Sequence, residues 1–494
     1  MPVSRRKFLK LSALSLAAVA LAACGSSPSA QLFASAGAAL GQASHPDELL
    51  IPRALRRILF APTPADLAHA RQIGLDAFID EQLAPNTISD PLVGPRLAGF
   101  ETLGMDPVQL AQTTPRQKPG QQLSQAALVR AVYSQRQLYE LMVDFWSNHF
   151  NIYLGKNTDR YLKTIDDREV IRHNALGKFP DLLMASAKSP AMLIYLDNAL
   201  SKSKAPNENY ARELMELHTL SVDGGYTQAD VHEVARALTG WTVSGLRAQS
   251  PGTFLFNSQI HDDGAKLILG HSFPAGQGIQ DGEQLLTMLA ESPSTARFIC
   301  TKLVRRFVAD DPPAALVASA SSTFTLTRGD ITSVMSVILH SSEFKASLGS
   351  KIKRPFEFIA SALRASGADF NPGPPTLDIL RHMGQPLFGW ESPNGFPDAA
   401  PAWITTNGVL SRWNYPLALA FHALSDTHLD PSQLVQAPAS SGGGLDALSL
   451  RLLGEPLPAS QRQVILDFAG NASFETIAPA LLALVLSAPI FFYR

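Results

Sequence analysis

The sequence predicts a mainly α-helical fold, a large irregular multi-helix domain with a few short strands. Helix-start signals recur along the chain, apolar residues return at three-to-four spacing, and alternating strand patterns are scarce. With 494 residues and 46% hydrophobic content, the chain can bury one large core or two to three smaller ones. Its formal net charge of −2 leaves no basic excess to neutralise a phosphate backbone, which argues against nucleic acid as a partner.

Capping signals predict where several helices begin. A capping box with proline at the first helical position stands at residues 63–66, and its helix stops before a glycine. Residues 134–137 open a second helix whose apolar positions recur at helical spacing. Short helices are predicted to start at residues 189–190 and 227–230, and a longer acidic helix is predicted over residues 208–220.

Strands and breaks are fewer than helices. The best strand candidates are residues 253–256 and 266–269. Proline- and glycine-rich breaks suggest sub-boundaries near residues 245 and 440 within one domain of residues 49–494. The Ala-Pro-Ala-Ser-Ser-Gly-Gly-Gly stretch at residues 437–444 predicts a surface linker before a C-terminal helical segment.

Residues 1–23 carry the features of a bacterial export signal. Arg5 and Arg6, followed by Lys-Phe-Leu, match the twin-arginine signature. The apolar run at residues 11–23 is shorter than the roughly 20 residues that a membrane-spanning helix needs. We therefore expect the chain to cross the cytoplasmic membrane rather than to span it.

The signal ends at Leu-Ala-Ala-Cys, which resembles a lipobox that is cut just before Cys24. Two acyl chains on this cysteine would give stable anchoring, with the protein facing the periplasm or the cell surface and residues 24–48 as a flexible tether. The alternative is an ordinary secretory peptide with an incidental cysteine. Cys300, the other cysteine, then has no partner and is expected to be a buried, inert thiol.

Further sequence blocks follow one another in a specific order along the mature chain. They include Phe-Trp-Ser-Asn-His-Phe at 145–150, the acidic block at 207–220, Gly-Gly-Tyr-Thr at 224–227, Arg-Arg-Phe at 305–307, Arg-Pro-Phe-Glu-Phe at 354–358, Gln-Pro-Leu-Phe-Gly-Trp at 385–390 and Arg-Trp-Asn at 412–414. Together they resemble the bacterial exported family catalogued as domain of unknown function 1800. The resemblance implies export and, often, a neighbouring gene for another uncharacterised, distantly sulfatase-like protein. It implies no established catalytic residue.

The predicted acidic helix holds the first candidate site. Glu213 and Glu216 are three residues apart, so their carboxylates share a face, as paired acids or ligands of a hard divalent metal must. His218 lies about 200° around the helix from Glu216 and falls outside that face unless the helix ends there. The alternative is a charge ladder in which Glu208, Arg212 and Glu216 pair at i, i+4 and i+8.

The loop after this helix resembles the second half of an EF-hand calcium loop. Gly224 would take the sharp-turn position and Asp230 the closing acidic position, with Asp223 as a further ligand. Thr219 stands where an EF-hand has its first Asp, which weakens the match. A tight turn followed by a helix N-cap explains the same residues.

His149 is the third candidate. It lies on an apolar helix face, where a hydrogen-bonded core histidine is the alternative to a functional one. Asp144, Asn148 and Asn151 form a polar stripe beside it that could line a cleft.

The fourth candidate is His261, which is followed by two aspartates and then Lys266, a set that could bind metal or transfer a proton. A polar turn is its alternative. Aromatic residues at 388–390 and 413–415 could stack against sugars, although large aromatics lie more often in the core.

The leading hypothesis is an exported, lipid-anchored cell-envelope enzyme, a metal-assisted hydrolase that acts on an extracytoplasmic polymer. Its catalytic candidates are Glu213, Glu216, His149 and His261, and its metal-ligand candidates are Glu213, Glu216, Asp223 and Asp230. The alternative is a non-catalytic binding or assembly lipoprotein that works with an exported partner protein. Candidate side chains gathered in one pocket would favour the enzyme, whereas scattered or ion-paired side chains would favour the binding protein. The sequence holds no nucleophile elbow, dinucleotide fingerprint or zinc-type cysteine spacing.

Overall fold

The structure, a computed structural model, describes residues 46–245, 252–436 and 440–494. Helices predominate in these ranges, and their strands form three two-stranded antiparallel sheets. The predicted mainly α class is thereby confirmed.

The predicted export signal and lipidation site are not part of this description. Arg5, Arg6 and Cys24 lie outside the described residues. Within the described ranges, none of the helices combines the length and the apolar character that crossing a membrane requires.

The first half of the described chain is built from short and medium helices. They are α3 (Pro46–Ile58), α4 (Pro64–Ile73), α5 (Leu75–Leu83), α6 (Val93–Leu97), α7 (Pro107–Gln112), α8 (Lys118–Tyr133), α9 (Gln137–His149), α10 (Asp159–Ile165), α11 (Arg172–Asn174), α12 (Phe179–Ala187), α13 (Pro190–Tyr195), α14 (Glu208–Glu213) and α15 (Gln228–Ala237). Two π-helical turns extend helices of this half, Asp166–Ile171 after α10 and Leu214–His218 after α14.

Two hairpins and a second helical series follow. The hairpins are β1 (Trp241–Val243) with β2 (Phe254–Phe256), and β3 (Lys266–Ile268) with β4 (His271–Phe273). The helices are α16 (Ile279–Glu291), α17 (Pro293–Phe307), α18 (Ala314–Leu326), α19 (Ile331–His340), α20 (Ser342–Ala346), α21 (Pro355–Ser366), α22 (Pro374–His382), α23 (Thr406–Ala420), α24 (Ser441–Leu453), α25 (Ala459–Ala469), α26 (Phe474–Ser487) and α27 (Pro489–Phe492). The two-residue strands β5 (Asp369–Phe370) and β6 (Thr427–His428) pair beside α22.

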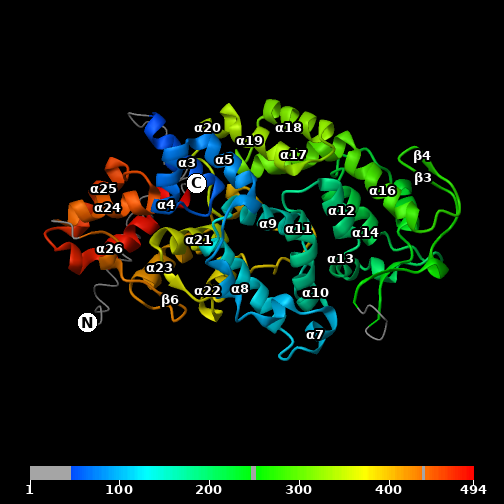
Figure 1. Ribbon diagram of the computed structural model, residues 1–494, viewed down its shortest axis with the longest axis horizontal. Coiled ribbons are helices and arrows are strands. Elements are labelled where there is room, and N and C mark those ends of the chain that lie inside the picture. Colours follow the sequence, from blue (N-terminus) through cyan, green and yellow to red (C-terminus); the bar gives the residue numbers. More distant parts are fainter. Residues whose placement is uncertain (1–45, 246–251, 437–439) are drawn as a thin grey trace.

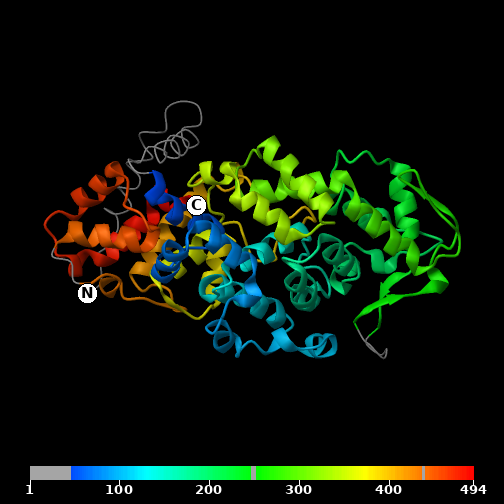
Figure 2. The same ribbon diagram turned by 45° about the horizontal axis from the view of Figure 1, so that its top comes forward.

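The described body is elongated (Figure 1). Helices α24, α25 and α26 form one end, α16 and the β3–β4 hairpin form the other, and α9 lies between them (Figures 1 and 2). The first and last described segments meet, because Arg57 of α3 donates a hydrogen bond to the backbone carbonyl of Arg494 at 2.8 Å. Buried apolar side chains form one contiguous core that extends in sequence from Ala54 to Tyr493.

The capping signals predicted four helix starts correctly. Thr63 and Thr227 each cap a helix through a complete capping box, at the starts of α4 and α15. The helices predicted after residues 134–137 and 189–190 are α9 and α13, and both strand candidates occur as β2 and β3.

Two predictions need correction. The helix over residues 208–220 is α-helical only to Glu213 and then widens into the π-turn Leu214–His218. The predicted linker at residues 437–444 is wrong from Ser441 onward, since Ser440 caps α24 by accepting a hydrogen bond from the amide of Gly443. Gly444 allows Phe474 to pack closely against this helix, because a Cβ would lie 2.0 Å from the ring of Phe474. Residues 437–439 lie outside the described ranges.

The predicted burial of Cys300 is confirmed. The thiol is fully enclosed on α17, and burial raises its pKa to about 12. A thiol with so high a pKa carries almost no thiolate near neutral pH, so it reacts slowly.

Candidate functional site: a cationic pocket beside helix α9

Helix α9 presents a row of polar side chains toward its neighbours. Asp144 accepts a hydrogen bond from Arg306 of α17 at 2.9 Å and a second from Arg354, the residue before α21. Asn148 follows one turn later, on the same side of the helix, and His149 is the next residue. The polar stripe predicted from the sequence is therefore a real contact surface, and α9 joins α17 to α21 through it.

Arginines and carboxylates form a buried network behind this surface. Glu357 of α21 forms ion pairs with Arg306 at 2.6 Å and with Arg494 at 3.0 Å, and Asp398 lies 3.3 Å from Arg306. Burial alone would raise the pKa of Glu357, but the surrounding arginines hold it well below its usual range. With Arg354, three arginines are matched by three carboxylates: Asp144, Glu357 and Asp398.

A long irregular segment, residues 383–405, runs between α22 and α23 and covers this surface. Asn148 holds it by donating to the carbonyl of Phe396 at 2.8 Å and accepting from its amide at 2.7 Å. Asn151 donates to the carbonyls of Trp390 and Ser392. Loops of this length without regular structure are uncommon in compact domains and are often functional.

Glycine is required where this segment crosses α9. Gly395 has φ +71°, and a Cβ there would lie 2.2 Å from the carbonyl oxygen of Asn148. Glycine adopts a positive φ without strain, and it alone lacks the Cβ that would block so close a backbone approach. The approach fixes the segment 383–405 directly over the end of α9.

His149 and Lys302 meet on the other side of Asn148. The Lys302 ammonium donates to Nδ1 of His149 at 2.8 Å, while Nε2 of His149 lies 3.2 Å from the backbone carbonyl of His218. A carbonyl only accepts, so Nε2 carries the hydrogen and Nδ1 is the acceptor. His149 is therefore both the buried, hydrogen-bonded histidine of the alternative interpretation and the support of a lysine that faces a cavity.

Electrostatics keep this histidine neutral. Burial, assisted by the adjacent Lys302 charge and by His218, holds the pKa of His149 well below its usual range. Burial likewise lowers the pKa of His218 to about 3. Lys302 thus rests on a neutral acceptor rather than on a carboxylate.

The pKa of Lys302 is lowered to about 8. Burial is the largest cause; Asp398 opposes it and Arg305 adds to it. Neither Lys302 nor Arg305 forms an ion pair with any described residue, and the Arg305 Nε donates to the backbone carbonyl of Asp310. These two cations are the unmatched charges of the region.

Around them lies a pocket of about 280 Å³. Its walls come from α9, α17, the start of α21 and the segment 383–405, and its lining side chains include Phe145, Asn148, His149, Lys302, Arg305, Arg306, Arg354, Trp390, Asn394, Phe396 and Asp398. Trp390 and Phe396 give it an aromatic wall, with ring centroids 4.9 Å apart. We call this cavity the Lys302 pocket.

The model of a family described as "protein of unknown function (DUF1800)" matches residues 53–493. The chain belongs to this family. Neither the curated proteins nor the solved structures contain a match to it.

Several of the sequence blocks that carry the family resemblance meet at the Lys302 pocket. The block 145–150 supplies Asn148 and His149, the block 305–307 supplies two arginines, and the block 354–358 supplies Arg354. Trp390 ends the block 385–390. Segments that lie far apart in the sequence of this chain therefore line one cavity.

Glu213 and Glu216 lie elsewhere, at the junction of α14 with its π-turn. Burial, with the nearby Glu216 charge, raises the pKa of Glu213, and Arg212 opposes this rise. Glu216 accepts a hydrogen bond from the Tyr226 hydroxyl at 3.4 Å. Of the proposed charge ladder, the pair between Arg212 and Glu208 is present at 3.4 Å.

The loop that resembled an EF-hand uses its acidic residues differently. Asp230 accepts from the amide and hydroxyl of Thr227 at 2.8 and 2.7 Å and from the amide of Leu269 at 2.7 Å. Its carboxylate oxygens are therefore engaged by the N-cap, which is the alternative weighed above. Asp223 is exposed, and Thr219 donates its hydroxyl to the carbonyl of Leu214.

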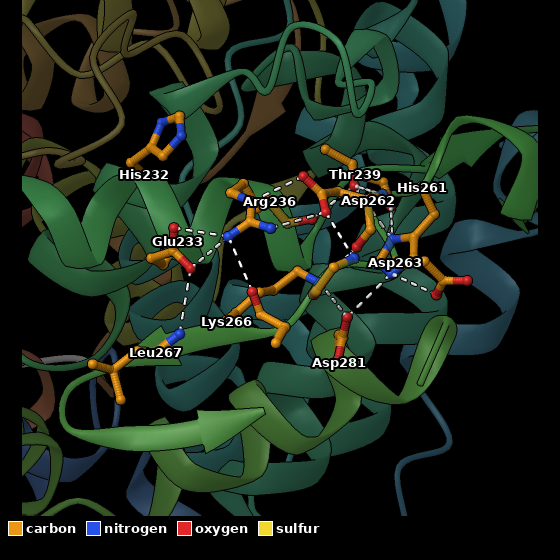
Figure 3. Close-up of polar contacts among 12 residues, drawn as sticks. His232, Glu233, Arg236, Thr239, His261, Asp262, Asp263, Lys266, Leu267 and Asp281 are labelled. Carbon is orange, nitrogen blue, oxygen red and sulfur yellow. Dashed lines mark hydrogen bonds and ion pairs between the residues drawn. The ribbon is translucent and has the colours of Figure 1, made fainter. Parts of the chain in front are cut away.

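His261 lies in a separate polar cluster (Figure 3), beside the β3–β4 hairpin that forms one end of the molecule (Figure 1). Its Nε2 lies 3.2 Å from a carboxylate oxygen of Asp281 and its Nδ1 lies 2.8 Å from the carbonyl of Thr239. Lys266 donates to the same Asp281 oxygen at 2.6 Å, and Arg236 pairs with Asp262. These contacts tie the β3–β4 hairpin to α15 and α16, as expected of a structural polar turn.

The sequence candidates are thus spread over three places. His149 lines the Lys302 pocket, the Glu213–Glu216 pair lies beside Tyr226, and His261 lies near the β3–β4 hairpin. Over the described ranges, no group of three or more His, Cys, Asp or Glu side chains has an arrangement suited to a metal ion.

Sequence reasoning missed Lys302 and Arg305 as site residues. With Arg306 they stand at i, i+3 and i+4, so all three share one face of α17. A basic stripe on an otherwise amphipathic helix was the signal that could have found them.

Proposed function

We propose that the chain is an exported, lipid-anchored cell-envelope protein whose Lys302 pocket binds an acidic sugar unit of an extracytoplasmic polymer. One observation carries the proposal: Lys302 and Arg305 line an open cavity, and neither forms an ion pair with a described carboxylate. Unpaired, partly buried cations favour an anion that replaces the water around them.

The matched arginines support this assignment. Because Arg306 and Arg354 are held by carboxylates, they cannot swing away from the pocket wall. Asp398, the acidic lining residue, is itself engaged by Arg306. These two arginines therefore form a fixed, charge-matched wall, and the positive charge open to a carboxylate or sulfate group comes from Lys302 and Arg305.

Aromatic side chains supply the other half of the recognition surface. Trp390 and Phe396 line the same cavity as Lys302, and the indole nitrogen of Trp390 is held by Asn394 at 2.9 Å. Aromatic faces bury the apolar C–H surface of a ring, so an anionic ligand with a ring fits better than a small inorganic anion.

Of the two sequence-based hypotheses, the binding lipoprotein has the stronger support. The carboxylates proposed as metal ligands lie away from the pocket or are engaged in a helix cap, and Asp144 is held by two arginines. Export and lipidation rest on Arg5, Arg6 and Cys24, and cooperation with an exported partner protein rests on the family resemblance.

A calorimetric titration of the soluble chain lacking residues 1–45 tests the proposal. Galacturonate and sulfated galactose should bind, with affinity that falls as salt rises, because charge supplies part of the interaction. Galactose, which has the same ring without the charge, should bind at least about tenfold more weakly, a difference of about 1.4 kcal/mol. Equal binding of galactose and galacturonate, or of neither, would contradict the proposed function.

A further inference from the structure

Lys302 is held in an arrangement suited to a reactive amine. One of its hydrogens is donated to Nδ1 of His149, which is fixed by its own bond to the His218 carbonyl. Its remaining positions are free of any other hydrogen bond to the described residues and lie at the wall of a 280 Å³ cavity. The amine is therefore oriented by one contact and otherwise open to a ligand.

The charged and titratable groups around this amine come from four elements. His149 belongs to α9, His218 to the π-turn after α14, Arg305 to α17 and Asp398 to the segment 383–405. Asp398 favours the ammonium, but burial and Arg305 disfavour it more, and both histidines are neutral near pH 7. A substantial fraction of the amine is therefore unprotonated near neutral pH.

We propose that Lys302 is a covalent attachment site for an anionic aldehyde or ketone, whose charged group is held by Arg305 and the arginine wall of the pocket. The inference rests on the proposed anion site and adds a reaction to it. The class includes 2-oxo acids and the open-chain reducing end of an acidic sugar.

The reaction needs no oxidant or metal. The nitrogen lone pair of neutral Lys302 attacks the carbonyl carbon, a C–N bond forms, and the carbonyl π pair moves to oxygen and takes up a proton. Loss of water then breaks the C–O bond and forms a C=N bond. Both hydrogens of the released water balance those lost by the amine, so the products are an imine and one water.

His149 favours attack by the neutral Lys302 amine because the imidazole stays neutral and does not take up the proton itself. Its low pKa keeps Nδ1 a pure acceptor, so the neutral amine can keep one N–H bonded to His149 while its lone pair faces the cavity. A carboxylate at this place would instead stabilise the ammonium and suppress attack.

Reductive trapping tests the inference on the folded chain. The protein is incubated with glyoxylate and cyanoborohydride at pH 7.5, and each lysine is quantified by peptide mass spectrometry. Lys302 should be modified at least about tenfold faster than the exposed Lys178 and Lys204, because its lowered pKa of about 8 gives it a large neutral fraction at pH 7.5. The rate at Lys302 should level off above about pH 8.

Propanal, a neutral aldehyde, and Arg305→Gln serve as controls. With propanal, the ratio of the modification rate at Lys302 to that at Lys204 should shrink severalfold. Arg305→Gln should slow the modification of Lys302 by glyoxylate but not its modification by propanal. Equal rates at Lys302 and Lys204 with glyoxylate would overturn the inference. If galacturonate still bound reversibly in that case, the proposed function would stand; if it did not bind, both would fall.

Discussion

The ammonium of Lys302 lies 2.8 Å from Nδ1 of His149, a histidine that the fold keeps neutral. This pair places a positive charge at the wall of a cavity without giving it a counter-ion of its own. The neighbouring arginines are matched by carboxylates, so the charge of Lys302 and that of Arg305 are directed to whatever enters the pocket.

The neutral histidines behind the pocket predict acid sensitivity. A histidine whose folded pKa is about 3 takes up a proton in the unfolded chain below about pH 6.5 but not in the folded chain, so stability is full above pH 6.5 and falls as pH falls. Between about pH 6 and pH 4, the free energy of unfolding of the wild type should fall by about 1.4 kcal/mol per pH unit because of His218. His218→Gln should remove this part of the fall. The substitution keeps the backbone carbonyl that holds His149.

Urea unfolding at several pH values measures this effect. His173→Gln is the matched control because His173 is exposed, and it should leave the slope of stability against pH unchanged. A His218→Gln slope equal to the wild-type slope would show that His218 is not the source of the acid sensitivity.

The buried ion network predicts a large loss of stability when one carboxylate is removed. Glu357→Gln leaves Arg306 and Arg494 short of their shared partner in an enclosed site, which should cost about 3–5 kcal/mol. The exposed pair of Asp378 with Arg381 provides the comparison, and Asp378→Asn should cost less than about 1 kcal/mol. Similar unfolding free energies for the two variants would mean that the network contributes little.

Substitution of Glu213 tests whether Glu213 and Glu216 bind a metal ion or form a carboxylate pair without one. Its raised pKa means that ionisation in the folded chain is unfavourable, so its stabilising contribution is present below about pH 4.5 and is lost as pH rises through the folded pKa. Without a metal, Glu213→Gln should therefore leave the melting temperature at pH 7.5 unchanged or raise it by a few degrees, and a chelator should have no effect.

The metal-assisted hydrolase hypothesis predicts the reverse. A divalent ion shared by Glu213 and Glu216 would stabilise the fold, so a chelator would lower the wild-type melting temperature and Glu213→Gln would abolish the difference. We expect the metal-free result because the described residues offer the pair no third metal-binding side chain.

Export and anchoring are tested in the cell. Replacing Arg5 and Arg6 by lysine should keep the protein in the cytoplasm, because the twin-arginine route requires both arginines. Cys24→Ala should leave soluble or uncleaved protein, since the lipid has no other attachment point. Fractionation with immunoblotting measures both. If the variant with lysine at positions 5 and 6 were bound to the membrane in the same amount as the wild type, export by the twin-arginine route would be excluded.

Local signals in the sequence predicted much of the fold. Thr63 and Thr227 cap their helices as expected, because a capping box depends on residues only three positions apart. The predicted linker is wrong from Ser441 onward for the opposite reason: Gly444, a residue that locally disfavours a helix, leaves room there for the ring of the distant Phe474. Tertiary packing overrides local preference there.

The candidate site depended still more on long-range contacts. His149 was found because its polar neighbours share its helix, whereas Lys302 lies 153 residues away and Arg354 lies 210 residues from Asp144. Spacing along one helix cannot show which distant helix supplies the partner. The contacts of Asp230 show the same dependence, because Leu269, whose amide donates to its carboxylate, lies 39 residues further on.

The affinity of Arg305→Gln for galacturonate tests the central claim most directly. Arg305 makes no ion pair within the described structure, so its loss should disturb the fold little while removing half of the unmatched charge in the pocket. We predict that the dissociation constant rises at least about tenfold relative to wild type, with Lys178→Gln, an exposed cation outside the pocket, unchanged. A folded Arg305→Gln variant that binds galacturonate as tightly as wild type would contradict the account.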